Sequence, residues 1–134
     1  MSAARGGAGM NRVVFSSLSP HWSTPDAVYK DLDAEFAFTY DPCPLEEPTF
    51  GLLRSWEGLR VFCNPPYGPE IAKYLVKARE PEVAVYLLPA RTDTKWFHEY
   101  CLQADEIRFI RGRLKFSGAQ HSAPFPSMVV IFRQ

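Results

Sequence analysis

The sequence predicts an α/β domain built around a mostly parallel β-sheet, with an antiparallel hairpin at its C-terminal end. Segments with helical spacing alternate with apolar strands along most of the chain, which is the pattern of parallel β-α units. Residues 83–90, VAVYLLPA, form a nearly continuous apolar run, as expected of a strand covered on both faces. With 134 residues and 46% hydrophobic content, the chain is large enough for one such domain with its own core.

A first helix is predicted to end near Phe36. Ser23 or Thr24 can cap its start, and Pro25 suits its first turn because the missing N–H is unpaired there anyway. Its apolar residues recur at helical spacing: Val28, Leu32 and Phe36.

The remaining elements follow from the same patterns. Residues 42–51 contain three prolines and predict a loop, and Gly112 predicts a bend or hairpin turn within the fourth strand. Further helices are predicted over 69–80 and over 92–104, the latter capped by Thr92, Asp93 or Thr94. Strands are predicted over 36–41, 58–64, 83–90, 106–116 and 127–134.

Composition excludes several classes of protein. The 15 Lys and Arg residues balance 15 Asp and Glu residues, which argues against a module held to nucleic acid by net positive charge alone. Three scattered cysteines and three histidines form no disulfide framework and no zinc pattern, so we expect a reducing cytoplasm and no metal. No apolar run is long enough to cross a membrane. We expect residues 1–15 to be a flexible tail and residues 16–134 to form the domain.

Polar residues follow three of the predicted strands. They are Asp41-Pro42-Cys43, Asn64-Pro65-Pro66-Tyr67 and Pro89 to Asp93. In parallel sheets ligands bind beyond the carboxyl ends of the strands, so these groups are expected to meet at one edge.

The Asn-Pro-Pro-Tyr stretch has the chemistry of a receptor for a planar amine. Two prolines fix the backbone and donate no hydrogen bonds, which leaves the carbonyls of Asn64 and Pro65 free to accept. The Asn64 side chain adds another acceptor oxygen, and Tyr67 adds a flat ring. A structural turn and an N-P-x-Y peptide for an adaptor domain are the other interpretations of this stretch.

The tetrapeptide resembles the [DNS]-P-P-[YFW] motif of S-adenosylmethionine-dependent amino methyltransferases. Five segments in the same order, running from about His21 to the end, resemble the phage-type DNA N-6-adenine methyltransferases, the phage Dam family. These segments are HWSTPDAVYKDLDAEFAFTYDPC, SWEGLRVFCNPPYG, LLPARTDTKWFHEY, IRFIRGRLKF and APFPSMVVIF.

The resemblance implies a shortened, Rossmann-like methyltransferase fold and transfer of a methyl group from S-adenosylmethionine to an adenine flipped out of double-stranded DNA. It assigns catalysis to Asn64, Pro65, Pro66 and Tyr67: the Asn64 oxygen and the Pro65 carbonyl would accept from the adenine amine, and Tyr67 would stack on the base. A phage or prophage protein acting in the cytoplasm of a bacterial host is implied. A monomer and a homodimer both remain open.

The resemblance also implies residues for the cofactor and for DNA. Cofactor-binding residues would be Trp22, Thr24, Pro25, Asp41, Pro42 and Cys43. DNA-binding residues would be Arg91, Asp93, Arg111, Arg113 and Lys115. Cys43 is interpreted as a small apolar residue near the cofactor, although Pro42-Cys43 resembles the Pro-Cys nucleophile of cytosine methyltransferases. The basic residues of RFIRGRLK could instead be the solvated face of an edge strand.

One departure from the family pattern concerns the cofactor. The Gly-rich loop is absent, and residues 42–58 are too few for two complete β-α units. Glu46 or Glu47 would then have to hold the ribose in place of the missing acidic strand end. The missing loop supports one alternative, a non-catalytic domain of the same fold that has lost its cofactor. The resemblance leaves a second alternative, a protein-glutamine N-methyltransferase, because the same motif serves methyltransferases that act on this planar amide.

Overall fold

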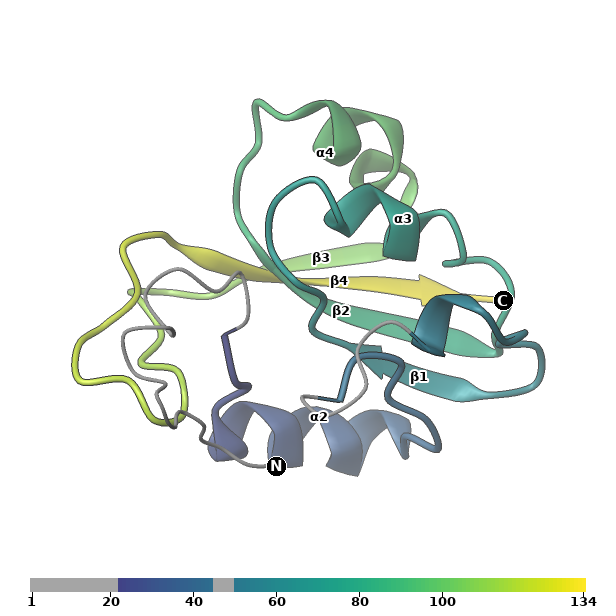
Figure 1. Ribbon diagram of the computed structural model, residues 1–134, viewed down its shortest axis with the longest axis horizontal. Helices are drawn as coiled ribbons and strands as arrows, with labels where there is room; N and C mark the ends of the chain where they lie inside the picture. The colour runs from purple at the N-terminus through teal and green to yellow at the C-terminus, as the bar shows by residue number, and fades with distance from the viewer. Residues whose placement is uncertain (1–21, 45–49) are drawn as a thin grey trace.

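The computed structural model describes residues 22–44 and 50–134. The tail predicted over 1–15 and the candidate ribose ligands Glu46 and Glu47 lie outside these residues. In the described part the chain alternates helices and strands (Figure 1). The elements are α2 (Asp26–Phe36), η1 (Phe50–Leu52), β1 (Arg60–Cys63), α3 (Ile71–Leu75), β2 (Val83–Pro89), α4 (Lys95–Glu99), η2 (Cys101–Gln103), β3 (Glu106–Phe109) and β4 (Ser127–Arg133).

The four strands form one sheet in the order β1-β2-β4-β3. The prediction of a mostly parallel sheet was wrong, because β1 and β2 pair in parallel while β4 is antiparallel to both β2 and β3. Burial explains the order. β2 and β4 are apolar on both faces and occupy the centre, whereas β3 alternates apolar and charged residues and takes the edge. The predicted antiparallel pairing of the two C-terminal strands is present, joined by the long connection 110–126.

Only β4 opposes the other strands, so β1, β2 and β3 all point the same way and their carboxyl ends meet at one edge of the sheet. The strand predicted over 36–41 is reduced to a single parallel bridge between Tyr40 and Val61. The reason is that α2 continues to Phe36, and Ala37 then turns in the left-handed region with a φ of 51°. Asp41 nevertheless follows the bridge at the same edge.

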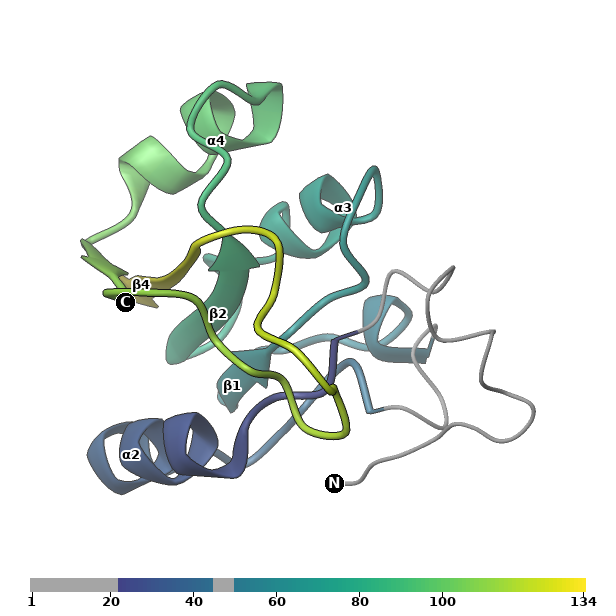
Figure 2. The same cartoon turned by 90° about the vertical axis from the view of Figure 1, so that its left-hand side faces the viewer.

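Helices cover both faces of this sheet: α2 lies on one side, and α3 and α4 lie on the other (Figures 1 and 2). On the α2 side, Arg60 Nε donates to the carbonyl of Phe36 at 2.6 Å. On the opposite side, the Tyr86 hydroxyl of β2 donates to the Tyr74 carbonyl of α3 at 2.7 Å. The fully buried Trp56 packs in the core. No helix among residues 22–44 and 50–134 has the length and apolar character needed to span a membrane.

The helix starts and lengths differ from expectation. Pro25, rather than Ser23 or Thr24, is the N-cap of α2, and no side-chain cap bond is present there. Thr94 caps α4 as one of the three predicted candidates, accepting from the Phe97 N–H at 3.2 Å. α3 spans only Ile71–Leu75 of the predicted 69–80, because the chain after it tightens into turns such as Ala78 N–H to the Leu75 carbonyl at 3.0 Å.

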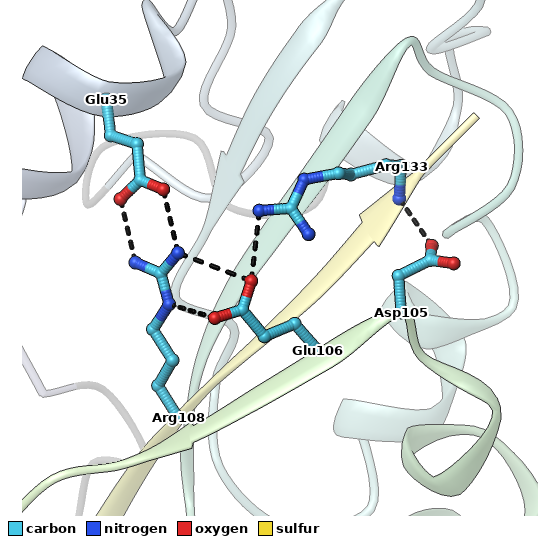
Figure 3. Close-up of polar contacts among 5 residues, drawn as sticks. All are labelled: Glu35, Asp105, Glu106, Arg108 and Arg133. Carbon is cyan, nitrogen blue, oxygen red and sulfur yellow. Dashed lines mark hydrogen bonds and ion pairs between the residues drawn. The ribbon is translucent and has the colours of Figure 1, made fainter.

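An ion-pair network fastens α2 to the edge of the sheet (Figure 3). Both oxygens of Glu35 on α2 accept from the Arg108 guanidinium on β3. Glu106 accepts from Arg108 and also from Arg133 on β4. The cationic side chain of Arg108 is therefore already neutralised within the protein.

Candidate active site

The three predicted strand-end groups lie at the same edge of the sheet. Asn64 and Arg91 follow the parallel strands β1 and β2, and Asp41 follows the bridge that joins Tyr40 to Val61 in parallel. Because these strands run in the same direction, their carboxyl ends lie at one edge of the sheet, where the groups were expected to meet. The connection 110–126 leaves β3 at this same edge and returns into β4.

Asn64 is held by the segment that precedes α2. Its Nδ2 donates to the carbonyl oxygen of Trp22 and, at 2.9 Å, to the Thr24 hydroxyl. An amide nitrogen has two N–H groups, so these two acceptors satisfy both of them. The orientation of the carboxamide is therefore fixed by residues that are distant in the sequence.

The Asn64 Oδ1 atom is buried and has no hydrogen-bond partner among the described residues. Buried side-chain acceptors are nearly always paired in folded proteins, so an unpaired one indicates a place for a ligand or a water molecule. Ser127 Oγ, at the start of β4, is the only other such atom in the described part of the chain.

The two prolines after Asn64 provide a second unpaired acceptor, the Pro65 carbonyl. Pro65 and Pro66 are both buried, and the Pro65 carbonyl accepts no hydrogen bond from any described residue. Further along the chain, the Gly68 carbonyl does accept a hydrogen bond, from the N–H of Ile71 at the start of α3. Stiff prolines thus leave the Pro65 carbonyl available, as the sequence predicts.

Tyr67 lies within a cluster of aromatic side chains. Its ring is only 7% exposed and packs against Phe125 at 5.6 Å and Phe116 at 6.5 Å between ring centroids, edge to face in both cases. Trp22 packs on the same two rings, at 5.2 and 5.4 Å. The Tyr67 hydroxyl donates to the Leu87 carbonyl at 3.2 Å, and burial raises its pKa far above the usual range.

Asp41 is half-buried near two buried cysteines. Burial raises the pKa of its carboxyl to about 6, although the Cys43 N–H donates to Oδ1 at 2.9 Å. Among the described residues no cationic side chain forms an ion pair with it. Cys43 and Cys63 are buried with their sulfurs 4.0 Å apart, and burial raises the pKa of the Cys63 thiol well above its usual range.

The predicted cofactor residues divide between two places. Pro42 and Cys43 are buried beside Asp41, whereas the contacts of Trp22 and Thr24 lie with Asn64 and the aromatic cluster. Pro25 is the N-cap of α2. The cofactor roles of these residues remain predictions.

The predicted DNA residues are exposed and mostly unpaired. Arg111, Arg113 and Lys115 form no hydrogen bond or ion pair with any described residue. The guanidinium of Arg91 lies over the Phe125 ring at 5.5 Å, and Asp93 is exposed nearby in the chain. β3 ends at Phe109, so the basic residues after it belong to the connection 110–126 and not to an edge strand.

Sequence reasoning missed the aromatic and hydroxyl residues of the connection. Phe116 and Phe125 surround Tyr67, and Ser117 donates to the backbone of Ser23 and Thr24. A signal was available, because Phe116 lies in RGRLKF and Phe125 in APFPSMVV, two of the segments that carry the family resemblance. Nothing in those segments taken singly indicates that they meet the tyrosine of the motif.

Comparison with known proteins supports the resemblance. A family model described as DNA N-6-adenine-methyltransferase (Dam) matches residues 14–134, which is nearly the whole chain. No curated protein matches the sequence, and no solved structure matches it. The match includes every candidate site residue, from Trp22 to Lys115. The chain therefore belongs to the Dam family of DNA N-6-adenine-methyltransferases.

Proposed function

We propose that this protein transfers the methyl group of S-adenosylmethionine to the exocyclic amine of an adenine flipped out of double-stranded DNA. The observation that carries the proposal is the buried Asn64 Oδ1, which has no partner among the described residues. It follows β1 directly and neighbours the free carbonyl of Pro65, in a chain of the Dam family.

Asn64 Oδ1 and the Pro65 carbonyl can each accept one N–H of a planar amine. Hydrogen bonds directed at both N–H groups oppose conjugation of the nitrogen lone pair with the ring, which makes the nitrogen more nucleophilic. The same two oxygens favour the positive charge that develops on nitrogen during transfer. Because the acceptors are fixed in advance, they need little reorganisation when the reaction occurs.

Asp41 suits the methionine end of the cofactor. Its half-buried carboxylate lacks a cation among the described residues, so the ammonium group of S-adenosylmethionine would relieve the cost of its burial. Pro42 and Cys43, both buried beside it, add apolar contacts. When bound, S-adenosylmethionine supplies a methyl group already activated by the sulfonium, so no basic residue with a tuned pKa is needed to start the transfer.

The aromatic cluster is the proposed place for the flipped base. Stacking of adenine on Tyr67 would contribute roughly 1–3 kcal/mol. Phe116 and Phe125 pack against that ring, which is only 7% exposed, so a base could stack on it once these side chains of the connection 110–126 are displaced. Arg111, Arg113 and Lys115 lie on the same connection and would contact DNA phosphates, which couples binding of the duplex to this movement.

The proposal is tested by incubating the protein with labelled S-adenosylmethionine and unmethylated DNA, followed by nucleoside analysis. Asn64→Ala is expected to lower transfer at least about 100-fold, while calorimetry shows cofactor affinity within about twofold of the original. Glu57→Ala, an exposed change outside the site, serves as the matched control. If the folded protein forms no N-6-methyladenine in DNA of varied sequence, the proposal is overturned.

The same assay separates the alternatives. Label found only in protein would favour a glutamine N-methyltransferase, since a glutamine amide is also planar and presents N–H groups. No binding heat with S-adenosylmethionine would favour a non-catalytic member of the family. The absent Gly-rich loop is the sequence feature that motivates this non-catalytic alternative.

A further inference from the structure

Residues 22–25, which we call the strap, join Asn64 to the connection 110–126. On one side, Asn64 Nδ2 donates to the Trp22 carbonyl oxygen and to the Thr24 hydroxyl. On the other side, Ser117 donates from its backbone N–H to the Ser23 carbonyl and from its hydroxyl to the Thr24 carbonyl, both at 3.0 Å. The strap is therefore fixed from two sides.

The Thr24 hydroxyl does not serve the helix that follows it. α2 begins at Asp26 after the N-cap Pro25, without a side-chain cap bond. Instead the hydroxyl lies 2.9 Å from Asn64 Nδ2. Thr24 thus has a role at the candidate site that its position before a helix does not suggest.

The strap gives the Asn64 carboxamide a fixed polarity. If the amide rotated by half a turn, Oδ1 would face the Trp22 carbonyl, which can only accept, and the oxygens would repel each other. Nδ2 would then enter the space where Oδ1 now lies unpartnered among the described residues. The observed orientation presents an acceptor to that space, and the reversed orientation would present a donor.

We propose that Thr24 is a positioning residue for Asn64, and that the strap makes the site select a ligand with an amine over one with a carbonyl at the same place. This inference rests on the proposed function, because it concerns the acceptor of the same amine. Loss of the Thr24 hydroxyl leaves one N–H of Asn64 without its acceptor, so the Trp22 carbonyl alone holds the amide and its orientation is less sharply fixed.

The kinetic test compares Thr24→Val, which removes the hydroxyl at nearly the same size, with Thr24→Ser, which keeps it. We expect Thr24→Val to lower kcat about tenfold and Thr24→Ser to stay within about threefold of the original. Because the Thr24 hydroxyl contacts Asn64, calorimetry should give cofactor affinity within about twofold for both variants. A larger loss in Thr24→Val alone would place the hydroxyl at the cofactor, as the family resemblance implies, and would overturn the positioning role.

The selectivity test uses duplexes that carry adenine or hypoxanthine at the position methylated by the original protein. Hypoxanthine replaces the exocyclic amine with a carbonyl. We expect competition binding to favour adenine by at least about tenfold in the original protein and in Thr24→Ser, and the ratio to be smaller in Thr24→Val, where the Trp22 carbonyl alone orients the amide. A purely structural role for Thr24 would weaken both duplexes equally.

An NMR measurement tests the contact without activity. The side-chain amide signals of Asn64 are identified by their loss in Asn64→Asp, and their exchange with solvent is followed in both Thr24 variants. Exchange about tenfold faster in Thr24→Val alone supports the contact. Unchanged exchange with an unchanged binding ratio overturns it, whereas absence of DNA methylation by the original protein overturns only the proposed function.

Discussion

Arg108 on the edge strand β3 donates to both carboxylate oxygens of Glu35 on α2, at 2.7 Å each, although the two residues are 73 positions apart (Figure 3). The parallel geometry of such a pair is specific to arginine, since lysine offers a single charged point. Glu106 shares the same guanidinium and joins Arg133 to the network. Arg108 is therefore a structural residue, in contrast to the basic residues that follow it.

Arg108→Ala is expected to lower the free energy of unfolding, since it disconnects α2 from the edge of the sheet and leaves Glu35 and Glu106 without this partner. Arg108→Lys should recover only part of the loss, because it keeps the charge and loses the paired hydrogen bonds. Urea unfolding measures both variants. The difference from the original protein should shrink in high salt, which screens exposed charges. A loss that does not change with salt would show that the packing of the side chain matters more than its charge.

Removal of Arg111, Arg113 and Lys115 by alanine is expected to weaken DNA binding because these exposed cations have no acidic partner among the described residues. The dependence of log affinity on log salt should become shallower by about 0.9 for each phosphate that the variant no longer neutralises. Fluorescence anisotropy over a range of salt concentrations measures this slope.

Arg108→Ala is the matched control for that experiment, since it removes a cation from the same stretch of sequence that is already neutralised by Glu35. Its salt slope should equal that of the original protein. An equal decrease of the slope in Arg108→Ala and in the triple variant would contradict the division between the structural Arg108 and the proposed DNA-binding residues.

Asp41→Asn is expected to stabilise the protein above pH 6 and to leave stability unchanged near pH 4. The pKa of Asp41 is raised to about 6 by burial, so the folded state holds this proton longer than the unfolded state does. The original protein therefore loses stability as the pH rises from about 4 to 6, by at most about 3 kcal/mol from this group. The carboxamide of the variant has no proton to lose in this range, and its oxygen can still accept from the Cys43 N–H. Urea unfolding across this pH range gives the difference.

The same substitution should have the opposite effect on the cofactor. Loss of the carboxylate removes the proposed partner of the ammonium group, so S-adenosylmethionine should bind more weakly to Asp41→Asn. Calorimetry at a pH above 7 measures the affinity. Stabilisation with unchanged cofactor affinity would place the cofactor elsewhere.

Tyr67→Phe is expected to destabilise the fold by about 0.5–1.5 kcal/mol, because it removes the hydrogen bond to the buried Leu87 carbonyl. The ring is retained, so methyl transfer should stay within about threefold of the original. Tyr67→Leu keeps an apolar side chain but removes the aromatic face, and should lower transfer much further. Equal activity in both variants would show that stacking is not the role of this ring.

Gly51→Ala is expected to disturb the loop that carries Asp41. A Cβ atom at residue 51 would lie 2.0 Å from the Pro42 carbonyl oxygen, so the loop would have to shift. The Gly51 carbonyl also accepts from the buried Trp56 Nε1–H at 2.8 Å. Thermal unfolding should show a lower midpoint, and cofactor affinity should fall with it. Gly58→Ala tests backbone strain instead of a collision. A Cβ atom at residue 58 would meet no neighbouring atom, but the φ of 76° is one that alanine rarely adopts.

The local content of the sequence determined several features directly. The apolar runs 83–90 and 127–134 became the two central strands, because a segment that is apolar on both faces must be covered on both. The two prolines after β1 predicted a free carbonyl, since their own rings limit the backbone without help from distant residues. Five separated segments, read together, indicated the family that the comparison then confirmed.

Strand order and direction were decided by the tertiary structure. β4 enters between β2 and β3, and this makes most of the pairings antiparallel, but no local pattern distinguishes a strand that returns beside its neighbour from one that crosses over. The shortening of the strand over 36–41 had a similar cause, since both helix and strand patterns include Phe36 and the helix prevailed.

The sequence by itself determined which side chains could accept from an amine; the tertiary structure decided which atom of Asn64 is left without a partner among the described residues. Asparagine carries a donor and an acceptor on one carboxamide, and its composition is the same in either orientation. Trp22 and Thr24 lie 42 and 40 positions earlier in the chain and meet Asn64 only in the folded protein. Their oxygens hold Nδ2 and leave Oδ1 without a described partner, so the polarity of the site depends on contacts that no local stretch contains.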